Sequence, residues 1–160
     1  MRIAVLGVGS IGGVLLGALS DTDCDLVAIS RGSSANNLSS MGLVLYSPEG
    51  PIDAIPPERF ETFDSESGPV PAGFADNCDA AFICGKADST PILAQIADEM
   101  LKKDGMAISL QNGMGHAQAL AHRLGRERTL GGITTHGAWR DDVGTHWVGR
   151  GSITLGSLDA

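Results

Sequence analysis

The sequence predicts an α/β fold of the Rossmann type, a doubly wound parallel sheet with a short antiparallel addition at its C-terminal end. Two observations carry this prediction. Short apolar segments alternate with helical patterns along the chain, and the first segment joins its helix through a G-x-G-x-x-G turn. With 160 residues, 42% of them hydrophobic, and a mean hydropathy of +0.08, we expect a single domain over residues 1–160 with one substantial core.

The glycine turn follows the apolar segment 3–6 and opens the next helix. Its first glycine permits a tight turn, its second lets the backbone approach a pyrophosphate, and its third lets helix and strand pack closely. The amino end of the helix then offers free N–H donors and a positive dipole to phosphate oxygens. We therefore predict a dinucleotide-binding domain whose phosphate contacts come from Gly7, Val8, Gly9, Ser10, Ile11 and Gly12.

The same stretch has an alternative interpretation as a signal peptide or membrane span. Arg2 is followed by eighteen uncharged residues, which is the length expected of such a segment. The run also contains five glycines, and each costs a helix about 1 kcal/mol relative to alanine. Dinucleotide binding explains those glycines, whereas a membrane span only tolerates them.

Charge and composition exclude several classes of function. The net charge of −8 and the isoelectric point near 4.7 argue against nucleic-acid or anionic-membrane partners. Three cysteines with no C-x-x-C pair indicate neither a disulfide framework nor a zinc site. The four histidines have no metal-ligand spacing, so we expect no metal, reduced thiols and a cytoplasmic location.

The residue after the second predicted strand, 26–30, is Arg31. In a Rossmann unit a carboxylate there binds the ribose 2′-hydroxyl of NAD, whereas an arginine accommodates the 2′-phosphate of NADP. Asp21, Asp23 and Asp25 precede the strand and lie at its wrong end. Arg31 could instead be an ordinary solvated charge, but its position favours phosphate binding, so we predict NADP (NADPH) as the cofactor.

The predicted sheet has six parallel strands in the order 3-2-1-4-5-6, with helices between them. The expected helices cover 10–19, 34–41, about 90–101 and 116–124. A proline-rich, acidic stretch from 47 to 77 contributes one or two short strands, at 52–55 and 59–63, and a terminal hairpin turns at 149–151. The six strands are 3–6, 26–30, 43–46, 80–84, 106–110 and 129–135.

Two further polar residues follow predicted strands directly. Lys86 leaves the strand 80–84, and Asn112 leaves the strand 106–110. Asn-Gly is a common turn signal, but ligands of open α/β sheets bind at the carboxyl ends of the strands. An amide at 112 is therefore a candidate contact to nicotinamide or substrate.

These residues together resemble the amino-terminal domain of the 2-dehydropantoate 2-reductase (ketopantoate reductase) family. The matching motifs are M-R-I-A-V-L-G-V-G-S-I-G-G at the start, Arg31, G-K-A at 85–87, L-Q-N-G-M-G at 110–115, and G-x-G-x-x-x-L-G at 149–156. The resemblance covers essentially the whole chain. Its most specific part is the pairing of G-K-A with L-Q-N-G-M-G, since the glycine turn alone fits many families.

The resemblance implies that Arg31 and Lys86 hold the adenosine end of NADPH and that Asn112 lies beside nicotinamide and substrate. It implies an oxidoreductase that reduces 2-dehydropantoate to pantoate in pantothenate and coenzyme A biosynthesis, or a relative acting on another 2-oxo acid, as a homodimer. Family members carry a second, helical domain that supplies the general-acid lysine and a substrate-binding carboxylate, and we expect these 160 residues to lack it. A nucleotide-binding module without catalysis of its own therefore remains the alternative.

Overall fold

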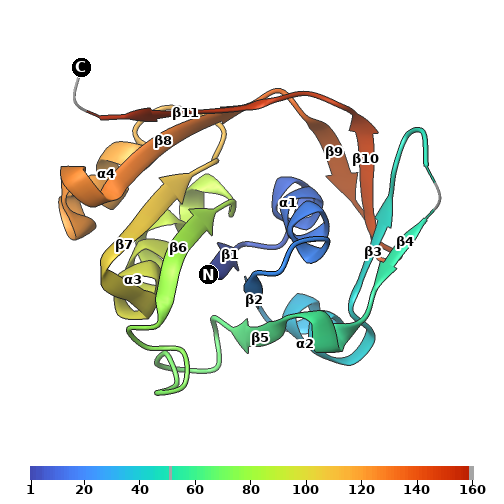
Figure 1. Ribbon diagram of the computed structural model, residues 1–160, viewed down its shortest axis with the longest axis horizontal. Coiled ribbons are helices and arrows are strands. Elements are labelled where there is room, and N and C mark those ends of the chain that lie inside the picture. Colours follow the sequence, from blue (N-terminus) through green and yellow to red (C-terminus); the bar gives the residue numbers. More distant parts are fainter. Residues whose placement is uncertain (51, 159–160) are drawn as a thin grey trace.

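The computed structural model describes residues 1–50 and 52–158, which form two sheets and four α-helices. The larger sheet, sheet A, has seven strands in the order β11-β8-β7-β6-β1-β2-β5 (Figure 1). The first strand lies near its centre. The bounds are β1 Arg2–Leu6, β2 Asp25–Ser30, β5 Glu61–Asp64, β6 Cys78–Ile83, β7 Leu101–Ser109, β8 Thr129–Thr134 and β11 Ile153–Ser157.

Sheet A confirms the predicted fold class. Six neighbouring strands, from β5 to β8, pair in parallel, and β11 adds antiparallel to β8 with Leu155 opposite Gly132. The continuous apolar runs of β1 and β2 are buried on both faces, as expected for a parallel sheet covered by helices. The carboxyl ends of these strands therefore gather at one edge.

The prediction was wrong about the edge strand beside β2. Segment 43–46 does form a strand, β3 Leu43–Tyr46, but β3 lies in a second sheet, and β5 takes the place beside β2. β3 alternates buried and half-buried residues, which is the pattern of a strand covered on one face only. Its apolar composition alone could not identify its sheet.

The second sheet, sheet B, has four strands in the order β4-β3-β10-β9, with β4 Asp53–Ile55, β9 Gly137–Arg140 and β10 Thr145–Gly149. The predicted hairpin at 149–151 does not form. Strand β10 pairs antiparallel with β9 and parallel with β3, whereas β11 crosses to sheet A. Figure 1 shows β8 running on into β9, and β10 returning into β11.

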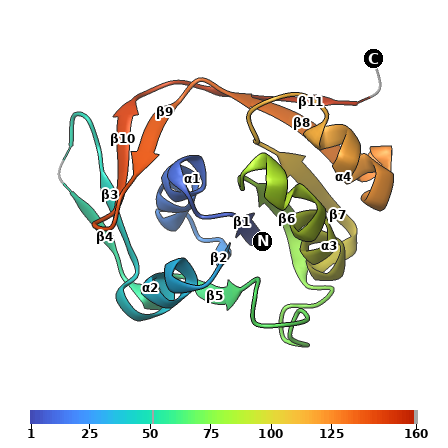
Figure 2. The same ribbon diagram turned by 180° about the vertical axis from the view of Figure 1, so that it is seen from behind.

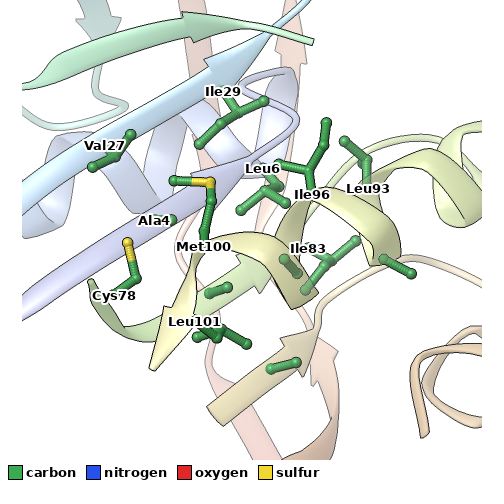
Figure 3. Close-up of a cluster of buried hydrophobic side chains, with 14 of the residues drawn as sticks. Ala4, Leu6, Val27, Ile29, Cys78, Ile83, Leu93, Ile96, Met100 and Leu101 are labelled. Atoms are coloured by element: carbon green, nitrogen blue, oxygen red, sulfur yellow. The ribbon is translucent and has the colours of Figure 1, made fainter. Parts of the chain in front are cut away.

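Helices cover both faces of sheet A. α3 Thr90–Met100 and α4 His116–Leu124 pack on one face, whereas α1 Ser10–Ser20 and α2 Ser33–Met41 pack on the other (Figures 1 and 2). The first core is drawn in Figure 3, where Leu93, Ile96 and Met100 of α3 meet Leu6, Ile29 and Ile83 of the sheet. Helix α4 has the predicted bounds, and no helix of the described residues is long and apolar enough to cross a membrane.

Helix α1 lies between the two sheets, and its glycines allow the contact with sheet B. A Cβ atom on Gly13 would overlap the side chain of Thr145 in β10, and one on Gly17 would lie 2.6 Å from Leu45 Cδ2 in β3. Thr145 is fully buried at this contact. Sheet B is therefore fixed to the same helix whose first turn follows the glycine turn.

Candidate functional site

A pocket of about 660 Å³ opens at the carboxyl edge of sheet A. The glycine turn, the loops after β2, β6 and β7, and the end of β9 line it. Gly12 packs beneath the turn, so a Cβ atom there would overlap the Gly7 carbonyl oxygen. The other predicted site residues all line the pocket: Gly7, Val8, Gly9, Ser10, Ile11, Arg31, Lys86 and Asn112.

The turn is built around two glycines with different tasks. Gly7 has φ +90°, donates its N–H to Ile29 O at 2.8 Å, and would place a Cβ 2.5 Å from backbone atoms of Gly85. Gly9, in contrast, would place a Cβ in open space, with no atom within 4 Å. The backbone at Gly9 is thus uncovered on its pocket side, and a phosphate group fits such a cradle.

Hydrogen-bond donors face the same cradle. The first bond of α1 runs from Gly13 N to Gly9 O at 2.9 Å. The amides of residues 10–12 precede that bond, so the helix itself gives them no acceptor. Together with the positive end of the helix dipole, they favour an anion at this place.

Arg31 lines one end of the pocket, together with Ser30 at the end of β2 and Ser34 in the first turn of α2. Because β5 neighbours β2, the loop after β5 also reaches this end and contributes Ser65 and Glu66. Sequence reasoning missed Glu66, since it placed 43–46 beside β2. A carboxylate and a guanidinium thus share this end of the pocket.

Gln111 is a second residue that the sequence prediction missed. Its buried side-chain amide donates to Gly85 O at 2.9 Å, Lys86 O at 3.2 Å and Thr90 Oγ1 at 2.9 Å. It therefore fixes the loop that carries Lys86 to the end of β7. The L-Q-N-G-M-G motif at 110–115, which contains Gln111, was the signal that could have identified it.

Asn112 is exposed to the pocket because two glycines turn the chain after it. Gly113 and Gly115 have φ values of +106° and +88°, a region that disfavours side chains with a Cβ. His116 Nε2 lies 3.1 Å from Asn112 O, and His116 Nδ1 lies 3.3 Å from Thr90 Oγ1. The main chain at 112 is anchored through its carbonyl, so its side-chain amide stays available to a ligand.

Arg140 reaches the pocket from sheet B, and nothing in the sequence indicated it. Its guanidinium Nη1 donates to the carbonyl oxygen of Val8, 132 residues away in the chain. Burial lowers the pKa of Arg140 from its usual value. The pocket thus holds three cationic side chains, those of Arg31, Lys86 and Arg140, in a chain of net charge −8.

The pocket wall also contains a cysteine, Cys84. Burial raises the pKa of the Cys84 thiol to about 12. That thiol is neutral at physiological pH and serves as an apolar wall. Among the described residues, no three His, Cys, Asp or Glu side chains are grouped to hold a metal ion.

Fold and pocket geometry together define a Rossmann-like domain, with an open glycine turn and its pocket at the carboxyl edge of a parallel sheet. The sequence profile described as "Ketopantoate reductase PanE/ApbA" matches residues 3–160. The chain belongs to this family of oxidoreductases, which confirms the resemblance found in the sequence.

Individual relatives agree with the family. The chain is 30% identical over 159 residues to a 2-dehydropantoate 2-reductase of Halobacterium salinarum, covering 98% of this chain and 49% of the relative. It is 29% identical over 157 residues to that of Pyrococcus horikoshii, covering 98% and 47%. The chain thus spans about half the length of these relatives.

Solved structures share the fold. The 2-dehydropantoate 2-reductase of Geobacter metallireducens superposes with a TM-score of 0.79 at 25% identity, covering 99% of this chain and 50% of that one. A D-mandelate dehydrogenase in complex with NADH and anilino(oxo)acetate superposes equally well, with a TM-score of 0.79 at 21% identity over 99% and 48%. The same fold therefore occurs in enzymes with different substrates.

Proposed function

We propose that this chain is the NADPH-binding part of a reductase that acts on a 2-oxo acid such as 2-dehydropantoate. The observation that carries the cofactor assignment is Arg31, which lines the pocket directly after β2 with no carboxylate within 4 Å of its guanidinium among the described residues. A guanidinium at that place matches a 2′-phosphate, which NADH lacks. The relatives' names support the substrate class.

The cofactor, when bound, supplies a hydride to the keto carbon of the substrate. The residues of this chain bind and orient it: the glycine turn receives the phosphates, Arg31 and Lys86 lie at the adenosine end, and Asn112 presents its amide at the nicotinamide end. An amide can polarise a carbonyl oxygen but has no acidic proton to give. The proton donor therefore belongs to the part of the relatives that this chain does not span.

The exposed apolar side chains of sheet A indicate where a second domain packs. Ile133 and Leu155 are 73% and 43% exposed on β8 and β11, beside a groove of about 400 Å³ that begins at the loop 113–115. We propose that the helical half of the complete enzyme covers this groove and delivers the proton donor toward Asn112.

The test of the cofactor assignment is calorimetry of Arg31→Ala with NADPH and with NADH. A lost charge-assisted contact is worth about 1.5–3 kcal/mol, or roughly a tenfold to hundredfold weaker affinity for NADPH. NADH affinity should stay unchanged, and Arg123→Ala is the matched control, because Arg123 pairs with Asp98 at 3.1 Å, away from the pocket. Equal losses for the two cofactors would contradict the assignment.

A rate measurement tests whether this chain binds the cofactor while the remaining half of the enzyme supplies the proton donor. The purified 160-residue chain should bind NADPH yet leave it unoxidised with 2-dehydropantoate, because loss of general-acid catalysis alone costs about 10²- to 10⁴-fold. The full-length Pyrococcus horikoshii relative serves as the active control. Turnover by the chain alone at about 1 s⁻¹ or faster would place the donor within this sequence, with Lys86 the first candidate.

A further inference from the structure

We infer that Arg140, from sheet B, binds the pyrophosphate of the dinucleotide at the glycine turn. This inference rests on the proposed function and adds to it a contact from outside the βαβ unit that contains the glycine motif. It also assigns a task to sheet B, which contributes no strand to sheet A.

The position of the guanidinium is set by the turn itself. Arg140 Nη1 donates to the carbonyl oxygen of Val8, the residue between the two glycines that shape the turn. The Arg140 side chain lines the same pocket as Gly9, whose backbone is uncovered. The cation therefore lies at the turn that a phosphate is expected to approach.

The charge of Arg140 is not neutralised by the protein. No carboxylate lies within 4 Å of it among the described residues, and its one hydrogen bond there is the bond to Val8 O. A guanidinium has five N–H donors in a planar fork that matches two oxygens of one phosphate. A half-buried cation with four donors still unused is a receptor for an anion.

Two contacts hold Arg140 in place against α1. Its β10 partner in the sheet register is Thr145, which packs on Gly13 in the second turn of the helix. Its neighbour Trp139 stacks on His146 with ring centroids 3.8 Å apart, and His146 stacks on Tyr46 of β3 at 4.5 Å. The helix end and the guanidinium are thus positioned by one packed unit, as a preorganised anion site requires.

A substrate carboxylate is the other anion that could meet Arg140. The bond to Val8 O favours the pyrophosphate, because it fixes the guanidinium to the phosphate-binding turn, whereas Asn112, the substrate contact of the proposed function, lies after β7. The experiment separates the two possibilities with ligands that contain a pyrophosphate and no carboxylate.

The test is a set of dissociation constants for NADPH, ADP-ribose and 2′-AMP. ADP-ribose has the pyrophosphate without nicotinamide, and 2′-AMP has neither the pyrophosphate nor a carboxylate. Arg140→Ala should weaken NADPH and ADP-ribose binding about tenfold to a hundredfold and leave 2′-AMP within about twofold. The variant should also lower the salt dependence of NADPH binding, which a purely structural change would not do.

Two further variants separate charge from structure. Arg140→Gln can keep a donor to Val8 O but has no charge, so it should lose ADP-ribose affinity at an unchanged melting temperature, whereas Arg140→Lys should recover part of it. Arg150→Ala removes a cation of the sheet B end that is paired with Glu49 and stacked on Trp147, and it should leave all three constants unchanged.

The outcomes that overturn the inference are distinct. Unchanged NADPH and ADP-ribose affinities in Arg140→Ala and Arg140→Gln, with the unaltered chain binding both, overturn this inference alone. Equal losses for 2′-AMP and ADP-ribose in both variants show a general collapse of the pocket and also overturn it. An unaltered chain that binds no NADPH overturns the proposed function together with this inference.

Discussion

Among the residues that the structure describes, charged side chains are paired at the amino ends of the sheet A strands and unpaired at their carboxyl ends. At the amino edge, Arg2 pairs with Glu61 at 2.9 Å and Lys102 pairs with Asp79 at 2.6 Å. At the carboxyl edge, no carboxylate lies within 4 Å of the three pocket cations in the described chain. Paired charges stabilise a fold, whereas unpaired cations beside free backbone amides are typical of an anion-binding site. Variants at the two edges should therefore affect different measurements.

The largest effect is expected within the carboxyl edge, where two neighbouring glycines should behave differently. Gly7→Ala places a Cβ against the Gly85 backbone at φ +90°, so we expect a loss of about 2–5 kcal/mol in unfolding free energy. Gly9→Ala meets nothing within 4 Å and should keep its stability within about 1 kcal/mol while weakening NADPH binding. Urea unfolding and cofactor titration of both variants check this, and equal stabilities would contradict it.

At the amino edge, Asp79→Asn should lower stability and leave cofactor affinity unchanged. The Lys102 ammonium and the Arg2 amide, which donates at 2.7 Å, hold the pKa of Asp79 below its usual value. A lowered pKa in the folded state means that the stabilisation is complete above the unfolded pKa, near 3.8, and disappears as the pH falls through the folded value.

Thermal melts of this variant from pH 7 down to pH 2 should therefore converge with those of the unaltered chain at the acid end. Asp142→Asn is the control, since Asp142 is exposed in the loop between β9 and β10. A difference in melting temperature that persists unchanged at the lowest pH would show that the carboxylate charge is not responsible.

The smallest effect concerns Glu66, a carboxylate at the end of the pocket that holds Arg31. Glu66 is exposed and lines the pocket with Arg31, so it should repel a 2′-phosphate weakly. Glu66→Gln should bind NADPH about twofold to fivefold more tightly at low salt and NADH unchanged, with the gain vanishing at high salt. Tighter NADPH binding that is independent of salt would assign Glu66 a role other than repulsion.

Local sequence patterns predicted most of the helices and strands, because each of these elements is encoded by neighbouring residues. The glycine turn with α1, the apolar strands β1, β2 and β6, and the bounds of α4 all follow from periodicity and caps. The sheet assignment of β3 and the terminal hairpin were wrong. Both features depend on pairing with a strand far away in the chain, and the local sequence of a segment such as Leu43–Tyr46 does not indicate its partner strand.

The candidate site follows the same division. Every predicted residue that follows a sheet A strand lies in the pocket, since the carboxyl ends of parallel strands meet at one edge. Glu66, Gln111 and Arg140 were missed for different reasons. Glu66 could be placed at the pocket only by knowing that β5 lies beside β2. Gln111 follows the strand next to Asn112, and only Asn112 was considered as a ligand contact. Arg140 has the sequence context of a solvent-exposed charge, and only its contact with Val8 places it at the pocket.

The pairing of β3 with β10 also has a consequence for the order of folding. These strands run parallel, with Leu45 opposite Thr145, one hundred positions later in the chain, so their contact closes a very long loop. Contacts of such separation form late, because loop closure must be compensated by structure already present. We expect a chain emerging during synthesis to complete the β1–α1–β2 unit first and to gain sheet B, and with it the arginine at the turn, only at the end.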